Sequence, residues 1–154
     1  MAALTLALTL PDICGRAEYG SIEVGKRYKS WYESYIGQYE KPGDAYGDDM
    51  PYLSGEIIYS LRCQLLHIGN PNITQNQIKE PTCKVDHFVL KVNDATLSDL
   101  SVISYENNPN NLERSYEASV DLLCRKLCKV ALQYYENNRE KFNFFTYRIC
   151  DATD

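Results

Sequence analysis

The 154-residue sequence predicts a mainly α-helical fold, a four-helix bundle with a small antiparallel β-hairpin inserted between the third and fourth helices. Three observations lead to this class. Several segments repeat apolar residues at spacings of three and four, which is the pattern of a helix with one apolar face. The segment from about 72 to 111 is instead rich in turn-forming and β-forming residues. The length suits one domain, 1–154, with a single core.

The first two helices are predicted from the N-terminal part of the chain. Residues Ala2–Cys14 are rich in alanine and leucine, which favour a helix, and Pro11 allows a kink or a new first turn. Ser21–Lys41 is predicted to be an amphipathic helix that ends at Lys41-Pro42-Gly43-Asp44. Its aromatic stripe consists of Tyr28, Trp31, Tyr32, Tyr35 and Tyr39. We interpret the stripe as a core or dimer-interface face, with stacking on RNA bases as the alternative.

The third helix is expected over Tyr52–Ile68, where the apolar residues fall within about 100° of one another on a helical wheel. Gly69-Asn70-Pro71 provides a strong stop signal after it. Val85–Val92 and Leu100–Tyr105 have the composition of strands, and the turn residues between them predict a hairpin.

The fourth helix is expected to run from Leu112 to about Glu140, because apolar residues recur along one side of this segment. The following segment, Phe142–Cys150, is aromatic and β-prone, and we expect it to pair with the hairpin or to cover it.

Composition and charge limit the function classes. A formal charge of −5 and a pI near 5.1 exclude a protein that coats nucleic acid through its overall field, although a small local site remains open. The apolar start, Met1–Leu10, lacks the basic region of a signal peptide, and no segment has the length of a membrane span. We therefore expect a cytoplasmic protein that keeps its six cysteines reduced.

Arg62 and His67 are the candidate catalytic residues. They place a permanent cation and one of only two histidines near the end of an otherwise apolar helix, which does not need them for folding. Cleavage of RNA needs a group that transfers a proton and a cation that stabilises charge on the phosphorus oxygens, and histidine and arginine supply these two functions. Five residues apart on a regular helix, the two side chains project about 140° from each other.

The Arg-x4-His spacing near the end of a third helix resembles the HEPN superfamily, as do the flanking segments Tyr52–Gly69 and Leu10–Gly15, which are similar to uncharacterised bacterial proteins of this kind. The resemblance implies a four-helix fold found in prokaryotic toxins and RNA-processing proteins. It implies a metal-independent endoribonuclease that needs no cofactor, with a site formed at a homodimer cleft by Arg62 and His67 of both subunits. It also implies an antitoxin of the nucleotidyltransferase type as a partner protein.

The residues beside this pair, Tyr59, Cys63 and Gln64, are the predicted substrate-binding residues. One of them departs from the superfamily pattern, in which the residue after the arginine is usually polar. A neutral thiol at position 63 is a poor hydrogen-bonding partner for His67 one turn further along. This departure favours the alternative function, a catalytically inactive dimerisation or protein-interaction module.

Two structural alternatives accompany these predictions. Arg62 and His67 could bond to neighbouring groups and hold the helix end, with Glu56, Asp12 or Asp48 as acidic partners. Zinc could bind a set of three thiols and one imidazole, but on the expected strand Cys83 and His87 lie too far apart to share one ion. The members of that set are Cys83, His87, Cys124 and Cys128. We expect no metal, and we expect the last two cysteines to be buried for packing.

Overall fold

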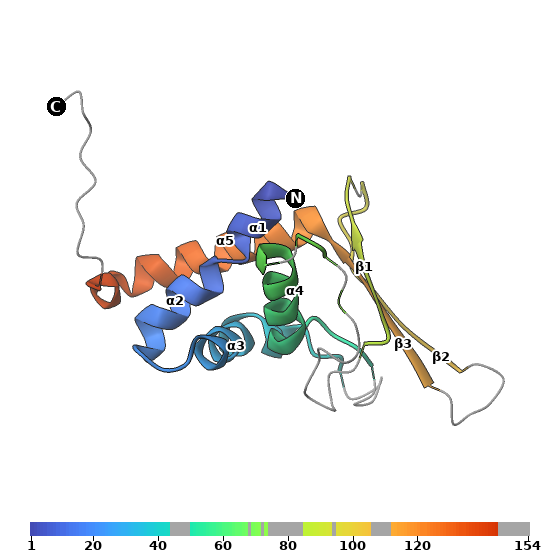
Figure 1. Ribbon diagram of the computed structural model, residues 1–154, viewed down its shortest axis with the longest axis horizontal. Coiled ribbons are helices and arrows are strands. Elements are labelled where there is room, and N and C mark those ends of the chain that lie inside the picture. Colours follow the sequence, from blue (N-terminus) through green and yellow to red (C-terminus); the bar gives the residue numbers. More distant parts are fainter. Residues whose placement is uncertain are drawn as a thin grey trace.

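The protein is described here from a computed structural model, in which residues 1–43, 50–67, 69–71, 73, 85–93, 95–105 and 112–144 are described. It is a mixed α/β fold in which a helical part packs beside a three-stranded sheet (Figure 1). The helices are α1 (Ala2–Ala7), α2 (Leu10–Tyr19), α3 (Val24–Tyr35), α4 (Gly55–His67) and α5 (Val120–Asn137). Short 3₁₀ helices occupy Gly37–Tyr39 and Arg139–Phe142. The strands are β1 (His87–Lys91), β2 (Leu100–Tyr105) and β3 (Leu112–Ser119).

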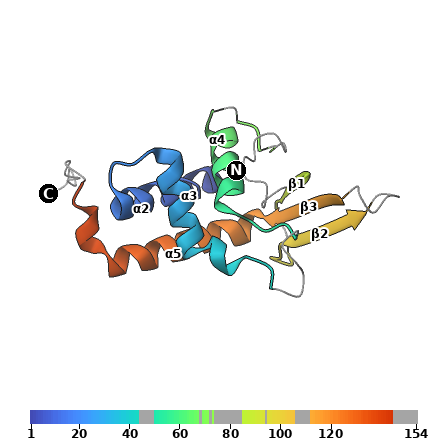
Figure 2. The same ribbon diagram turned by 90° about the horizontal axis from the view of Figure 1, so that it is seen from below.

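The helical part has a continuous apolar core. Helices α1 and α2 lie along α5, while α3 and α4 cross on the other side of the core (Figures 1 and 2). Tyr28, Trp31 and Tyr32 are fully buried, so the interpretation of the aromatic stripe as a core face is confirmed for these three residues. The predicted helix Ser21–Lys41 is wrong at its C-terminal end, because α3 ends at Tyr35 and a separate 3₁₀ turn follows. Tyr39 lies in that turn and is 78% exposed. Further fully buried members of the core are Leu4, Leu8, Leu53, Ile57, Ile58, Leu61, Leu123 and Leu127.

The predicted first helix is divided into two. The turn between α1 and α2 contains Leu8 and Thr9, and Pro11 stands in the first turn of α2. The first-turn N–H groups of a helix have no acceptor within the helix, so a proline, which has no backbone N–H, loses no hydrogen bond at this position. Helix α2 therefore begins here with a new axis. The third helix ends at His67, as the stop signal predicts, and Gly69 has the positive φ of 71° that glycine adopts without strain.

Two glycines allow the helices to approach closely. A Cβ atom added at Gly15 on α2 would lie 2.8 Å from the backbone oxygen of Arg27 on α3. One added at Gly55, the first residue of α4, would lie 2.9 Å from the backbone oxygen of Lys29. Helix α3 is therefore held between α2 and α4 by contacts that only glycine permits.

The sheet is not the predicted hairpin. Its strand order is β1-β3-β2, with β1 parallel and β2 antiparallel to the central β3. The two predicted strands are present within the predicted segments, but they lie on opposite sides of β3 and do not pair with each other. Residues 145–154 lie outside the described residues, so the prediction that Phe142–Cys150 pairs with or covers the hairpin has no outcome here.

The predicted fourth helix is wrong in its first eight residues. Leu112–Ser119 forms strand β3, and α5 begins at Val120 with Ser119 as its N-cap. The segment contains good helix formers, but hydrogen bonds to strands on both sides satisfy its backbone, and this tertiary pairing overrides the local preference. The buried side chains Tyr116 and Ala118 are two residues apart, which is the period of a strand.

A polar contact fastens the end of α5 to α2. The Glu18 carboxylate accepts hydrogen bonds from Lys141 Nζ at 2.7 Å and from the Tyr134 hydroxyl at 2.6 Å. These two hydrogen bonds, that from Lys141 first, lower the pKa of Glu18 from its ordinary value of 4.5. The carboxylate therefore contributes stability above pH 4.5, and this contribution is lost as the pH falls through the lower folded-state pKa.

Replacing Glu18 with glutamine is expected to lower the urea midpoint at neutral pH and to change it little in acid, where the carboxyl group is protonated in both states. Urea unfolding at the two pH values, followed by circular dichroism, measures the difference. The matched control is Glu136→Gln, an exposed residue of α5. An equal loss of stability by Glu18→Gln at both pH values would show that the ionised carboxylate is not what stabilises this contact.

Candidate functional site

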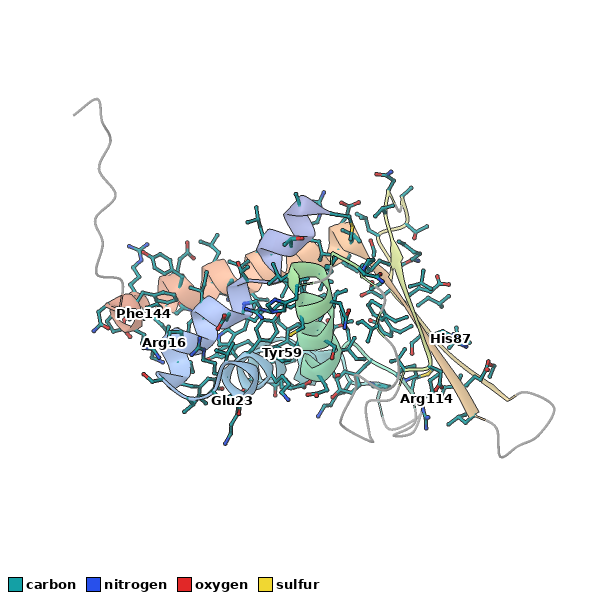
Figure 3. All side chains as sticks on the ribbon, viewed as in Figure 1. Arg16, Glu23, Tyr59, His87, Arg114 and Phe144 are labelled. Carbon is teal, nitrogen blue, oxygen red and sulfur yellow. The ribbon has the colours of Figure 1, made fainter. Side chains whose placement is uncertain are left out.

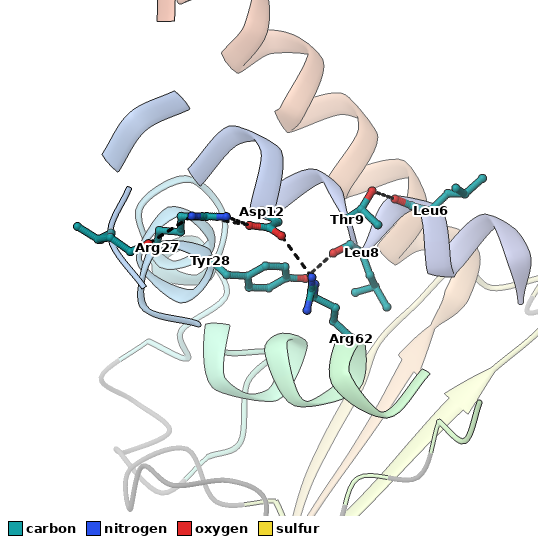
Figure 4. Close-up of polar contacts among 8 residues, drawn as sticks. Leu6, Leu8, Thr9, Asp12, Arg27, Tyr28 and Arg62 are labelled. Carbon is teal, nitrogen blue, oxygen red and sulfur yellow. Dashed lines mark hydrogen bonds and ion pairs between the residues drawn. The ribbon is translucent and has the colours of Figure 1, made fainter. Parts of the chain in front are cut away.

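Arg62 extends from α4 toward α2, where it shares the carboxylate of Asp12 with Arg27 of α3 (Figure 4). Arg27 donates from Nε and Nη2 to Oδ1 at 3.1 and 2.8 Å, and Arg62 donates from Nη2 to Oδ2 at 3.3 Å. The three side chains are only 14–23% exposed. Of the three expected acidic partners Asp12 is thus the one that Arg62 contacts, while Glu56 pairs with Lys29 at 2.7 Å and Asp48 lies outside the described residues.

The Arg62 guanidinium is also held by two aromatic rings. Its central carbon lies 5.6 Å from the ring centroid of Tyr28 and 5.9 Å from that of Tyr59. Among the described residues it donates a single hydrogen bond, and its buried Nε has no acceptor. An arginine carries five N–H donors, so most of its hydrogen-bonding capacity is unused. Two guanidinium groups share one carboxylate, which leaves one net positive charge in the cluster.

His67 is the last residue of α4 and is exposed. A group that exchanges protons with a substrate needs this access. The structure does not bring His67 to Arg62 within one protomer, because Arg62 points into the contact with α2 and α3 while His67 faces solvent. This agrees with the wide angle expected from their five-residue spacing.

The three predicted substrate-binding residues line one open groove between α3 and α4, with a volume of about 1240 Å³. Tyr59, Cys63 and Gln64 form part of its α4 wall, whereas Arg62 and His67 lie outside its lining. The pKa of Tyr59 is raised first by burial and then by its neighbour Cys63. The Cys63 thiol therefore faces Tyr59, one turn back along α4. Figure 3 shows Tyr59 between the two helices.

The opposite wall of the groove was missed by sequence reasoning. It carries the charged residues Glu23, Lys26, Lys29, Glu33 and Lys41 of α3 and its flanking segments. Together with Glu56 in the first turn of α4, the lining of the groove has three lysines and three glutamates. Glu33 also accepts a hydrogen bond from the Gly55 backbone N–H at 2.6 Å. The spacing of Lys26, Lys29 and Glu33, three and four residues apart on the helix face opposite the aromatic stripe, was the available signal. With its formal charges balanced, this groove offers no net attraction to a polyanion.

The alternative zinc site finds no support among the residues that the structure describes, where no group of three or more metal-binding side chains occurs. His87 is on β1, 62% exposed and 3.8 Å from Glu113 (Figure 3). Cys83 lies outside the described residues. The expectation that Cys124 and Cys128 are both buried for packing is wrong for Cys128, which is exposed, while Cys124 is partly buried against the core.

Comparison of the chain with models of protein families, with curated proteins and with solved structures finds no match in any of the three. The resemblance to the HEPN superfamily, carried by Arg62 and His67, stays a prediction. No helix in the described part of the chain combines the length and apolar character that a membrane span requires.

Proposed function

We propose that this chain is a HEPN-like RNA-binding protein that acts as a metal-independent endoribonuclease, with Arg62 and His67 of two subunits meeting in a homodimer cleft. The observation that carries the proposal is the Arg62 guanidinium, which has unused donors in a cluster of one net positive charge. A phosphate oxygen is the acceptor that best matches such a group.

In the proposed reaction the RNA 2′-hydroxyl attacks the adjacent phosphorus and the 5′-oxygen of the next nucleotide leaves. His67 acts as the acid or the base, for which its exposure at the end of α4 suits it. Arg62 stabilises the charge that builds on the phosphorane oxygens. The charge-balanced groove with Tyr59, Cys63 and Gln64 suits the sugar and base of the substrate better than its phosphates. Because the two catalytic side chains diverge on one helix, the mechanism requires the second subunit.

The test is incubation of the purified protein with structured and unstructured RNA in EDTA. Wild-type protein is expected to cleave RNA, and His67→Ala to lose activity by about 100-fold or more, because it removes the proton-transfer group. The matched control is His87→Ala, which removes the other histidine from an exposed position on the sheet. Equal activity of the wild-type and His67→Ala proteins would contradict the mechanism.

Mixed dimers test the shared cleft directly. Arg62→Ala and His67→Ala are each expected to be inactive alone, while a heterodimer of the two regains activity if arginine from one subunit meets histidine from the other. Circular dichroism must first show that Arg62→Ala is folded, because this residue also bonds to Asp12.

A second candidate function is the catalytically inactive dimerisation or protein-interaction module, with an antitoxin as its partner. The ion pair of Arg62 with Asp12 within one subunit favours it, since a guanidinium that fastens α4 to α2 already has a structural role. No cleavage by any variant, together with unchanged dimerisation in sedimentation experiments, would support this module over the enzyme.

A further inference from the structure

The groove between α3 and α4 contains a buried carboxylate that lacks hydrogen bonds. Glu56, in the first turn of α4, lines this groove and is only 7% exposed. Lys29 Nζ lies 2.7 Å from its Oε2 as an ion pair, but the two groups are not aligned for a hydrogen bond, and Oε2 accepts none among the described residues. Buried polar atoms ordinarily have such partners, and an ion pair that only joined two helices would gain from completing them within the protein. The acceptor capacity of Glu56 is therefore available to a ligand in the groove.

Two further groups of the groove surround this carboxylate. The Lys29 ammonium is the cation that covers Oε2, and it also lies 5.9 Å from the centroid of the Tyr59 ring. The Lys29 side chain is 35% exposed and has a flexible stem, so its ammonium can turn from Oε2 to an acceptor on a ligand and uncover both carboxylate oxygens. One region of the groove thus combines a carboxylate, a movable donor and an aromatic ring.

The hydrogen-bonding pattern of the RNA bases decides which of them matches this set. An ionised carboxylate offers acceptors only. Guanine presents two adjacent donors on its Watson–Crick edge, N1–H and N2–H, with the acceptor O6 beside them. Adenine and cytosine each place a ring-nitrogen acceptor next to their amino group, and uracil places its single N–H between two carbonyl groups. In those three bases a lone pair would face the carboxylate, so guanine is the base that fits both oxygens.

We propose that this groove binds guanine. Both oxygens of Glu56 accept hydrogen bonds from N1–H and N2–H, the Lys29 ammonium donates to O6, and the Tyr59 ring offers a face to the base. Guanine binding rests on the proposed function, in which the groove receives a base of the RNA substrate. The balanced formal charges of the lining agree with it, because the base is neutral and the phosphates lie elsewhere.

The experiment is isothermal titration calorimetry of the full-length protein in EDTA with GMP, AMP, CMP and UMP. GMP is expected to bind tighter than each of the others by about fivefold or more, the lower end of the discrimination that a bidentate contact to a base provides. IMP keeps O6 and N1–H but lacks the amino group at position 2, and it is expected to bind more weakly than GMP. These measurements need no substituted protein and no RNA cleavage.

Glu56→Gln tests the carboxylate itself. Its amide N–H would face the donors of guanine, so the variant is expected to lose the preference for GMP over AMP. The matched control is Glu136→Gln, which removes the same charge from an exposed position on α5 and is expected to keep the preference. Circular dichroism shows whether each variant is folded, and the comparison of GMP with IMP on the wild-type protein decides the matter if Glu56→Gln is not.

Three outcomes would overturn the site: no binding of GMP at millimolar concentration, equal affinity of the wild-type protein for GMP and the other nucleotides, or an unchanged preference in folded Glu56→Gln. The proposed function fails on a different result, the absence of RNA cleavage. A preference for GMP in a protein that cleaves no RNA would leave the guanine site standing without the enzyme. Cleavage of RNA by a protein with no such preference would leave the enzyme standing without the guanine site.

Discussion

Replacing Trp31 with alanine is expected to lower the free energy of unfolding by about 3–5 kcal/mol, the range for deleting a large aromatic side chain from a core. Trp31 is fully buried at the centre of an aromatic cluster. Its ring stacks on Tyr35 at a centroid distance of 5.2 Å and meets Tyr134 edge-on at 5.6 Å. The substitution therefore removes contacts between α3 and α5 and leaves a cavity that the rigid surroundings cannot fill.

Urea unfolding followed by far-UV circular dichroism measures this loss, because the only tryptophan is removed as a fluorescent probe. Tyr39→Ala is the control, since this aromatic residue of the same predicted stripe is 78% exposed. Its expected loss is within about 0.5 kcal/mol. Equal losses for the two variants would mean that Trp31 does not occupy the core position described.

Replacing Asp12 with alanine is expected to cost about 3 kcal/mol, near the lower end of the range for breaking a buried ion pair from one side. The change leaves the guanidinium groups of Arg27 and Arg62 without their common acceptor while both remain mostly buried. The substitution removes the ion pairs that join α2 to α3 and α2 to α4. Urea unfolding measures the loss, with Asp121→Ala at the exposed start of α5 as the control.

The same variant connects stability with the proposed function. Without Asp12 the cluster carries two net positive charges in place of one, so RNA binding is expected to tighten and to depend more steeply on salt. Fluorescence anisotropy with labelled RNA at several salt concentrations measures both effects under conditions where the variant is folded. Weaker RNA binding by folded Asp12→Ala would show that RNA does not contact Arg62.

The presence of the helical elements could be predicted from the sequence because their apolar residues follow the helix period, but only some of their ends could, since α3 ends at Tyr35 and not at the predicted Lys41. Such local patterns account for the end of α4 at His67, just before Gly69. They also account for the buried positions of Tyr28, Trp31 and Tyr32. The sheet could not be predicted in the same way. Leu112–Ser119 consists of residues that suit a helix equally well, and only its pairing with two strands distant in sequence makes it a strand.

The site divides along the same line. The five-residue spacing of Arg62 and His67 predicted that the two side chains point in different directions. Tyr59, Cys63 and Gln64 lie on one face of α4, and this face lines a single groove. Asp12 and Arg62 are 50 residues apart in the chain. Which of the three acidic candidates pairs with Arg62 depends on the packing of α2 and α4 against α3. A single sequence contains no local pattern for such a contact.

The hydrogen bond between Tyr134 and Glu18 joins residues 116 positions apart, and that between Lys141 and Glu18 joins residues 123 positions apart. During synthesis on the ribosome, α1 and α2 therefore emerge long before the helix that covers their apolar sides. High contact order of this kind slows folding, since a long loop must close before its contacts form. Leu4 and Leu8, which are fully buried in the folded protein, therefore lack the cover of α5 until translation reaches that helix.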